Sequence, residues 1–361
     1  MKLDIARDTL IGPLTKQVSI TEKRSIMPIL ANVLLEFGKG KVGIYSTDLE
    51  LSAISHVDYE GSVEKKIVVH GRKFLDILRE MDAETINMEV KDNVLTLRQK
   101  QSEFVLGLQE SDEFPEVKEI TGAHEFSIDG SSLLEMLEKV QFAISSDETR
   151  YVLTGMYMIG ADEIFSVVGT DGFRMALCKK KVDGLRDFKG VIVPKRTIME
   201  IERALGDSDS VRVVLGDKHV QFSSGSTILV SRLIEGGFPD YDNVIPKGNA
   251  NIARTDKMKL MRGLKKVSTI ISKSEPIKVT LQDQAIIIET ESEVGRARET
   301  VEADYKGEEL KMNFNIRFVM DVVTHIEEKE ILIKAPSSYG AVLFEGEGNE
   351  SYKNIVMPIR V

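Results

Sequence analysis

Three carboxylates stand where strand-like segments end, a position from which they could hold metal ions. They are Asp48, Glu50 and Asp171. Clustered carboxylates hold the ions of two-metal nucleases, so one hypothesis is a metal-dependent nuclease. An acid after a strand can also bind the amides of a tight turn, and such a turn can recur wherever the fold recurs. The chain favours this structural hypothesis, because a threonine–acid pair occurs three times, at Thr47–Asp48, Thr170–Asp171 and Thr290–Glu291.

Other catalytic patterns are missing from the sequence. The five histidines are scattered, and the segment GTDGFR at 169–174 lacks the spacing of a phosphate-binding loop. Cys178 is the only cysteine, which excludes an intrachain disulfide and a multi-cysteine metal site. We therefore expect no intrinsic catalysis, no metal and no cofactor.

The elements that carry the threonine–acid pairs recur along the chain with a period of about 120 residues. Each pair ends a run rich in β-branched residues, and each copy contains two helix-period patterns. These patterns lie at 6–18 and 70–81, at 129–145 and 193–205, and at 255–271 and 314–326. Asp129 and either Thr255 or Asp256 are expected helix N-caps, and Pro13 is expected to kink the first helix.

A chain of 361 residues is too long for one ordinary core, and the repeat divides it into three domains, 1–121, 122–247 and 248–361. Short strands joined by Gly and Asp turns, with few helices, predict an α+β fold with antiparallel sheets. The amino terminus lacks the apolar region of a signal peptide, and no run approaches the roughly 20 apolar residues of a membrane helix. We expect a cytoplasmic protein.

Basic residues gather on one face of the third copy's first helix, although the chain has a formal net charge of -10. Lys259, Arg262 and Lys266, here called the basic ridge, lie opposite an apolar stripe. Basic residues recur at matching places in the other helices, which predicts a phosphate-binding surface with strong salt dependence. Lysine and arginine also decorate ordinary solvated faces, and this alternative stays open for each residue alone. The matching residues are Arg72, Lys73, Lys195, Arg196 and Arg317, with Arg24 and Arg150 just after first helices.

Five segments together resemble the bacterial sliding clamps, the β subunits of DNA polymerase III, over essentially the whole chain. They are MPILANVLLEF (27–37), TRYVLTGM (149–156), GTDGFRMAL (169–177), FPDYDNVIP (238–246) and VMPIRV (356–361). The resemblance implies a head-to-tail homodimer of six clamp domains, closed around double-stranded DNA without reading its sequence. Its partners would be the polymerase α subunit, the clamp loader, and other polymerases and repair proteins.

The resemblance also implies three sets of site residues. The expected DNA contacts are Arg24, Arg72, Lys73, Arg150, Tyr151, Lys195, Arg196 and the basic ridge. The expected dimer interface comprises Lys73, Phe104, Ile270 and Ile271. A groove for short partner peptides would comprise Leu153, Thr170, Gly172, Phe173, Arg174, Met175, Pro239, Asn243, Val244, Met357, Pro358 and Ile359.

Two positions in that groove depart from the family pattern. Asn243 stands where many relatives have arginine, and Phe173 where some have histidine. These departures affect the expected peptide preference. A different alternative is a protein-interaction scaffold that never meets DNA, but such a scaffold would leave the basic ridge without a role.

Overall fold

The structure is a computed structural model of the chain. It describes residues 2–21, 27–38, 40–61, 63–82, 84–248, 251–271, 275–337 and 339–360. The chain divides into two compact units. The first unit contains Met1–Leu134 and Arg196–Leu233, and the second contains Glu135–Lys195 and Ile234–Val361.

The first unit is built on one antiparallel sheet, which has twelve strands among the described residues. Helices α1 (Arg7–Ile20) and α2 (Gly71–Glu80) belong to this unit, as does nearly all of α4 (Lys195–Leu205). In spatial order the strands are β1 (Lys2–Ala6), β6 (Thr85–Lys91), β7 (Val94–Gln99), β8 (Ser102–Gln109), β5 (Lys65–His70), β2 (Asn32–Gly38), β3 (Lys41–Thr47), β4 (Leu51–Asp58), β16 (Thr227–Arg232), β15 (His219–Ser224), β14 (Ser210–Leu215) and β9 (His124–Asp129).

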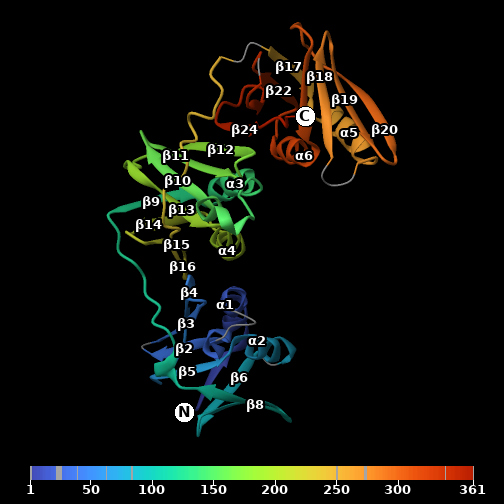
Figure 1. Ribbon diagram of the computed structural model, residues 1–361. Coiled ribbons are helices and arrows are strands. Elements are labelled where there is room, and N and C mark those ends of the chain that lie inside the picture. The colour runs from blue at the N-terminus through green and yellow to red at the C-terminus, as the bar shows by residue number, and fades with distance from the viewer. Residues whose placement is uncertain are drawn as a thin grey trace. The chain divides into compact units, whose positions relative to one another are not determined.

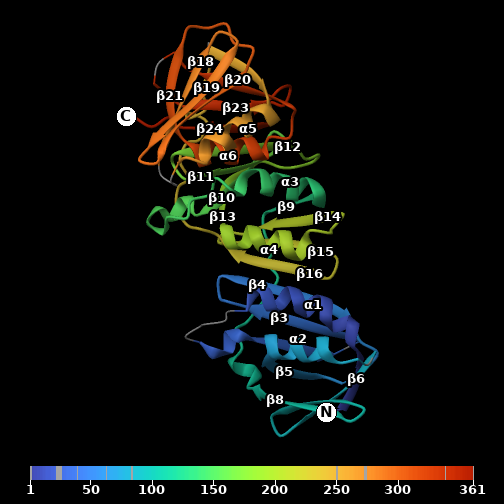
Figure 2. The ribbon, with the colours of Figure 1, turned by 90° about the vertical axis from the view of Figure 1, so that its right-hand side faces the viewer.

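Strand alternation sends one face of the first unit's sheet toward α1 and α2, which lie side by side across it (Figure 2). Val33, Leu35 and Phe37 of β2 are buried in the same core as Leu10 and Leu14 of α1. Because successive strand residues point to opposite faces, the intervening residues of β2 face away from this core. A single layer of sheet therefore separates α1 and α2 from the opposite face of the sheet, which we call the open face.

The second unit contains two antiparallel sheets, of eight and four strands among the described residues. Its helices are α5 (Lys257–Ser268), α6 (Ile316–His325) and most of α3 (Gly130–Gln141), with the 3₁₀ segment η3 (Glu148–Leu153). The larger sheet runs β13 (Phe188–Pro194), β10 (Gly155–Ala161), β11 (Ile164–Thr170), β12 (Arg174–Lys181), β24 (Tyr352–Val356), β23 (Val342–Gly346), β22 (Glu330–Ala335) and β17 (Asn251–Asp256). The smaller runs β20 (Gly295–Glu302), β19 (Ala285–Ser292), β18 (Pro276–Gln282) and β21 (Leu310–Asn315).

The predicted α+β class with antiparallel sheets is confirmed, and all six predicted helices form. Asp129 and Asp256 act as the expected caps, each accepting a backbone amide of the first helical turn, at 2.8 and 2.9 Å. Pro13 lies inside α1, which is a single helix from Arg7 to Ile20. Burial of Leu10 and Leu14 stabilises this helix, because tertiary packing supplies most helical stability in proteins. Figure 1 shows α5 beside α6 in the third copy.

Each unit contains a place where strands of successive copies pair. In the first unit, β4 pairs with β16 over five residues, and we call this pairing the first seam. In the second unit, β12 pairs with β24 over five residues, and we call this the second seam. The strand of the third copy that corresponds to β4 and β12 is β20, which lies at the edge of the four-stranded sheet. No helix in the described residues is long and apolar enough to cross a membrane.

Candidate peptide-docking surface and basic helices

Two turns have the same hydrogen bonds, one at Thr47–Leu51 and the other at Thr170–Arg174. In each, the threonine hydroxyl oxygen accepts the amide hydrogen two residues later, at 3.0 Å. One aspartate oxygen then accepts the next two amides, at 2.9 and 2.7 Å for Asp48 and at 2.9 and 3.0 Å for Asp171. These carboxylates hold turns, as the structural hypothesis predicts, and Asp48 is further paired with Arg196.

The third threonine–acid pair does not form this turn, so the prediction of three equivalent turns is wrong. Thr290 donates to the carbonyl of Pro276 at 3.3 Å, and Glu291 lies within β19 opposite Arg296. The β19–β20 hairpin continues past the pair, and its turn comes only after Ser292. The sequence pattern was the same, but the strand pairing around it differs.

At the second seam, strand pairing brings the carboxyl terminus against the turn at 170–174. The amide of Met357 donates to the carbonyl of Phe173 at 2.8 Å, directly after the β12–β24 ladder. Two residues later, the amide of Ile359 donates to the backbone carbonyl of Asn313 at 2.7 Å. The hydroxyl of Tyr339 donates to the backbone carbonyl of Pro358 at 2.5 Å. The predicted groove residues of the turn and the terminus are therefore neighbours.

An aromatic cluster places the segment 238–245 over the same part of the sheet. Phe238 stacks on Tyr157 with ring centroids 4.7 Å apart, and Tyr241 packs beside them. Together they cover a core that includes Met175 and Ile355. Burial raises the pKa of Tyr241 to about 12.

The predicted groove residues fall into exposed and buried groups. Phe173 is 53% exposed and Val244 is 42% exposed, which is high for large apolar side chains. We call the group Phe173, Pro239, Val244, Met357 and Ile359 the docking surface; all but half-buried Met357 are exposed. Leu153, Met175 and Pro358 are buried beneath or beside it. Thr170 and Gly172 form the turn, and Asn243 donates to its neighbour Asp240 at 2.6 Å.

Arg174 was predicted as a groove residue, but its side chain is only 12% exposed. It lies 5.3 Å from the ring of Phe142 and 4.5 Å from that of Phe318. It also pairs with Asp171, at 3.0 Å, and with Asp321 of α6. Arg174 therefore joins the second copy to the third, and its interactions are already satisfied within the unit.

Arg150 and Tyr151, predicted DNA contacts, lie next to the docking surface. The Arg150 guanidinium is 5.1 Å from the centre of the Phe173 ring, and it donates to the Asp171 carbonyl at 2.8 Å. Tyr151 is 58% exposed. The structure thus connects a predicted DNA contact with a predicted peptide contact through one stacking interaction.

The basic ridge lies on the exposed side of α5, as predicted, but two of its members have acidic neighbours on β20. Lys259 pairs with Glu302, and Lys266 pairs with Glu299 at 2.7 Å. Arg262 is exposed and has no ion pair within the described residues. Exposed pairs of this kind contribute little stability, so breaking them would have a small effect on the fold.

The other predicted DNA and interface residues lie in both units. Arg72 is exposed and pairs with Asp76 at 3.2 Å, whereas Arg196 pairs with Asp48 and donates to the Ile20 carbonyl at 3.0 Å. Lys73 is exposed and Lys195 is half-buried. Arg24 lies outside the described residues. The expected interface residues Phe104, Ile270 and Ile271 are all half-buried.

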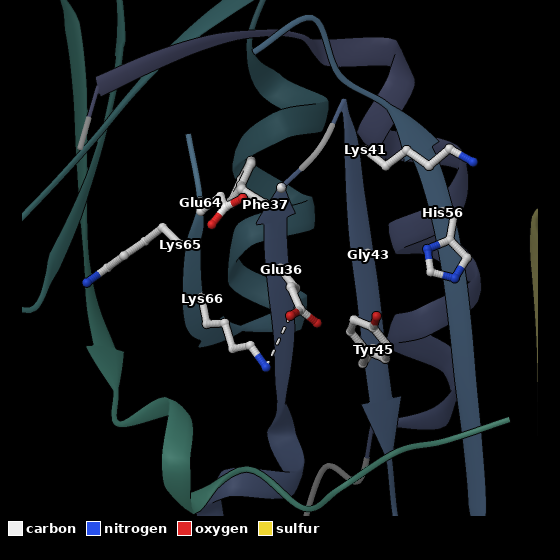
Figure 3. A pocket seen from close by; sticks show the side chains of 10 residues that line it. Glu36, Phe37, Lys41, Gly43, Tyr45, His56, Glu64, Lys65 and Lys66 are labelled. Carbon is white, nitrogen blue, oxygen red and sulfur yellow. Dashed lines mark ion pairs between the residues drawn. The ribbon is translucent and has the colours of Figure 1, made fainter. Parts of the chain in front are cut away.

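A hollow of about 690 Å³ lies on the open face of the first unit's sheet. Figure 3 shows Glu36, Tyr45 and His56 around Gly43, and the Tyr45 ring occupies the space that a side chain at Gly43 would need. Lys66 pairs with Glu36 at 3.1 Å, and burial followed by the Glu36 charge raises the pKa of Tyr45. The charged residues that line the hollow are of both signs and partly paired, and none of the predicted site residues lines it.

Sequence patterns missed a buried cation in the second unit. The Lys139 side chain is 7% exposed and pairs with Glu135 at 2.5 Å and with Glu327 at 3.2 Å. Burial alone would lower the pKa of Lys139, but the two carboxylates raise it overall. The Tyr352 hydroxyl donates to the carbonyl of Lys139 at 2.7 Å. The helical pattern of α3 gave no signal of this burial, because Glu327 and Tyr352 come from distant segments.

Family models for the DNA polymerase III β subunit match the chain in three successive blocks. The N-terminal domain model matches residues 1–118, the central domain model 127–240 and the C-terminal domain model 242–360. A β sliding clamp of Caulobacter vibrioides is 30% identical, with all of both chains covered. The chain belongs to the bacterial sliding clamp family.

Solved sliding clamps have the same fold over their full length. The DNA polymerase III β subunit of Pseudomonas aeruginosa superposes with a TM-score of 0.96 at 29% identity, covering all of both chains. That of Caulobacter crescentus gives 0.95 at 30% identity, again over all of both chains. A P. aeruginosa clamp bound to griselimycin gives 0.94 at 29% identity, with the same full coverage.

Family membership decides between the functional hypotheses. The chain is a sliding clamp, the non-catalytic subunit that tethers DNA polymerase III to DNA for processive synthesis. Neither the metal-dependent nuclease nor the scaffold without DNA is favoured. The aspartates that suggested a nuclease hold the two turns described above.

Proposed function

We propose that two copies of this chain close head to tail into a ring around double-stranded DNA, and that partner peptides bind the docking surface. Each of the two chains would contribute three clamp domains, 1–121, 122–247 and 248–361. The protein would work in the cytoplasm, with the polymerase α subunit, the clamp loader, and other polymerases and repair proteins as its partners.

The observation that carries the ring is that two strands, β8 and β20, correspond to seam strands but take part in neither seam. By their places in the copies, β16 and β24 correspond to β8, just as β4 and β12 correspond to β20. Among the described residues β20 pairs only with β19, and β8 pairs beyond β7 only with Val68 and Val69. Pairing β20 of one chain with β8 of a second chain would form another seam of the same kind. It would also pair the backbone groups that both strands leave unpaired within one chain.

A head-to-tail contact of this kind is heterologous, and such contacts give closed rings when the rotation between copies closes. The predicted interface residues support it. Phe104 lies on β8, and Ile270 and Ile271 directly follow the last turns of α5. Lys73 of α2 would add a charged contact at the rim.

We assign the DNA contacts to the basic residues of the helices and of the segments that follow them. They are Arg24, Arg72, Lys73, Arg150, Tyr151, Lys195, Arg196, Lys259, Arg262 and Lys266. A positive lumen in an otherwise acidic protein holds DNA inside the ring and disfavours binding outside. Because these residues would contact only the phosphates of the DNA, binding would not depend on the base sequence.

The test of encirclement compares DNA topologies. A clamp loader should place the protein on nicked circular DNA, and linearising that DNA should release it, because a ring slides off free ends. Equal retention on circular and linear DNA would contradict the ring. Charge reversal at Lys259, Arg262 and Lys266 should reduce loading while leaving griselimycin binding unchanged.

The test of the docking surface uses griselimycin, which is bound by the P. aeruginosa relative. We expect Phe173→Ala with Met357→Ala to weaken its affinity by about 30-fold or more, as expected for two apolar hot-spot residues. The matched control is Ile252→Ala, an exposed apolar residue on β17. An unchanged affinity in the Phe173/Met357 variant would place the ligand elsewhere.

A further inference from the structure

The first seam has the same backbone frame as the second. The amide of Arg232 donates to the Glu50 carbonyl at 2.9 Å, as that of Met357 donates to the Phe173 carbonyl at 2.8 Å. Both bonds directly follow a five-residue ladder, β4–β16 or β12–β24. With the matching turns at 47–51 and 170–174, the chain contains the frame of the docking surface twice.

The side chains on the two frames differ at the positions that matter for docking. Phe173 and Met357 of the second seam correspond to Glu50 and Arg232 of the first, which form an ion pair at 3.2 Å. Gly172, with φ of 86°, corresponds to Leu49, with φ of 79°. A leucine rarely adopts a positive φ, and here its side chain is 47% exposed.

The ion pair would obstruct an apolar ligand for a physical reason. Glu50 and Arg232 are both well exposed, at 64% and 50% of the side chain, so water now solvates much of each charge. A ligand that covered them with apolar groups would remove that water without providing new partners. Specificity between two similar sites is often set by such a repulsive element.

We propose that Glu50 and Arg232 keep the first seam closed to the peptides that bind the second, so that these two residues determine a single docking site per chain. The side chain of Leu49 adds bulk where the second seam has Gly172. This inference rests on the proposed docking surface, and it names the residues that restrict docking to one of two equivalent frames.

The first experiment transfers the second seam's side chains to the first. In a chain whose docking surface is disabled by Phe173→Ala and Met357→Ala, we add Glu50→Phe and Arg232→Met and titrate griselimycin by calorimetry. We expect affinity to recover by about tenfold or more, equivalent to about 1.4 kcal/mol. In the otherwise unchanged chain, the same two substitutions should raise the stoichiometry from one ligand toward two per chain.

The matched control is Glu50→Asp with Arg232→Lys, which retains the ion pair and should give no recovery. Circular dichroism must show that each variant is folded. A folded Glu50→Phe, Arg232→Met variant without recovered binding would overturn the inference. If the disabled chain still binds griselimycin normally, the proposed docking surface itself has failed, and this outcome is distinct.

A second measurement uses the unmodified protein, so it does not depend on how a variant folds. Hydrogen exchange with and without griselimycin should show protection at Gly172 and Phe173 but no change at Leu49 and Glu50. Protection at both turns would overturn the inference, because the first seam would then already bind the ligand.

Discussion

Arg174 was expected to face a peptide, and the structure gives it a different neighbourhood. Its guanidinium contacts Phe142, Phe318, Asp171 and Asp321, so it links β12 to α6. Removing a largely buried cation surrounded in this way takes the guanidinium partner from both Asp171 and Asp321. Its effect on peptide binding should therefore be indirect, through the position of the turn that precedes it.

We predict that Arg174→Ala lowers the free energy of unfolding by about 2 kcal/mol, because it leaves Asp171 and Asp321 without their partner. Urea unfolding followed by circular dichroism measures this change. The control is Arg298→Ala, which removes an exposed pair with Glu289 at 3.1 Å and should cost much less. Equal effects of the two substitutions would contradict the proposed role of Arg174.

Cys178 offers a test of burial at a single residue. Its thiol is buried in β12, and burial raises its pKa to about 11. Since only the thiolate is nucleophilic, we predict alkylation of the folded protein by iodoacetamide to be about 100-fold or more slower than that of the unfolded chain. Mass spectrometry after timed labelling measures both rates. Similar rates would mean that the site opens readily.

Among the elements, the helices were predictable from sequence and the seams were not. Helix-period stripes such as Leu260 and Leu264 identified α5, and its start was predicted at Thr255 or Asp256, of which Asp256 caps the helix. The seams pair strands that are far apart in sequence, as β12 and β24 are, and local periodicity carries no information on such pairing. For the same reason, the patterns missed the difference between Thr290 and the two earlier threonines.

The candidate site was predictable only in part. The resemblance indicated Phe173 and Val244, whose exposure agrees with a docking surface, and Met357, which is half-buried beside them. It also indicated Arg174, whose partners Phe142, just after α3, and Asp321, on α6, could not be inferred from its own segment. Lys139 was missed because a lysine in an amphipathic helix is usually solvated, and its burial depends on Tyr352 and Glu327 from the last domain.

We predict an acid-sensitive contact within α3, the ion pair between Glu135 and Lys139. The hydrogen bond from Lys139 lowers the pKa of Glu135 in the folded state, so this contact stabilises the fold above the unfolded pKa. That stability should be lost as pH falls from about 5 to about 3. Unfolding free energy measured over this range should decline less in Glu135→Gln than in the unmodified chain. An identical decline would argue against the contact.

At the scale of the whole molecule, the two edges β8 and β20 make the proposed assembly testable. We predict that Ile270→Asp with Ile271→Asp converts the dimer to a monomer, because charges would be buried in an apolar contact. Sedimentation velocity at micromolar concentration measures this. Ile252→Asp, an exposed apolar position on β17, should leave the dimer intact. A dimer that survives the double substitution would place the interface elsewhere.

Glu299 and Glu302 beside the basic ridge have a consequence for how the affinity for DNA depends on salt. These carboxylates are tethered counterions: when a phosphate displaces one from Lys259 or Lys266, fewer ions leave the DNA–protein system. Charge neutralisation by Glu299→Gln and Glu302→Gln should therefore tighten DNA binding and steepen the plot of log affinity against log salt concentration. Fluorescence anisotropy with duplex DNA over a salt series measures this slope, and an unchanged slope would contradict the exchange. If Lys259 and Lys266 always have a second partner, they can pass from phosphate to phosphate at low cost, and the lumen would then favour sliding over tight binding.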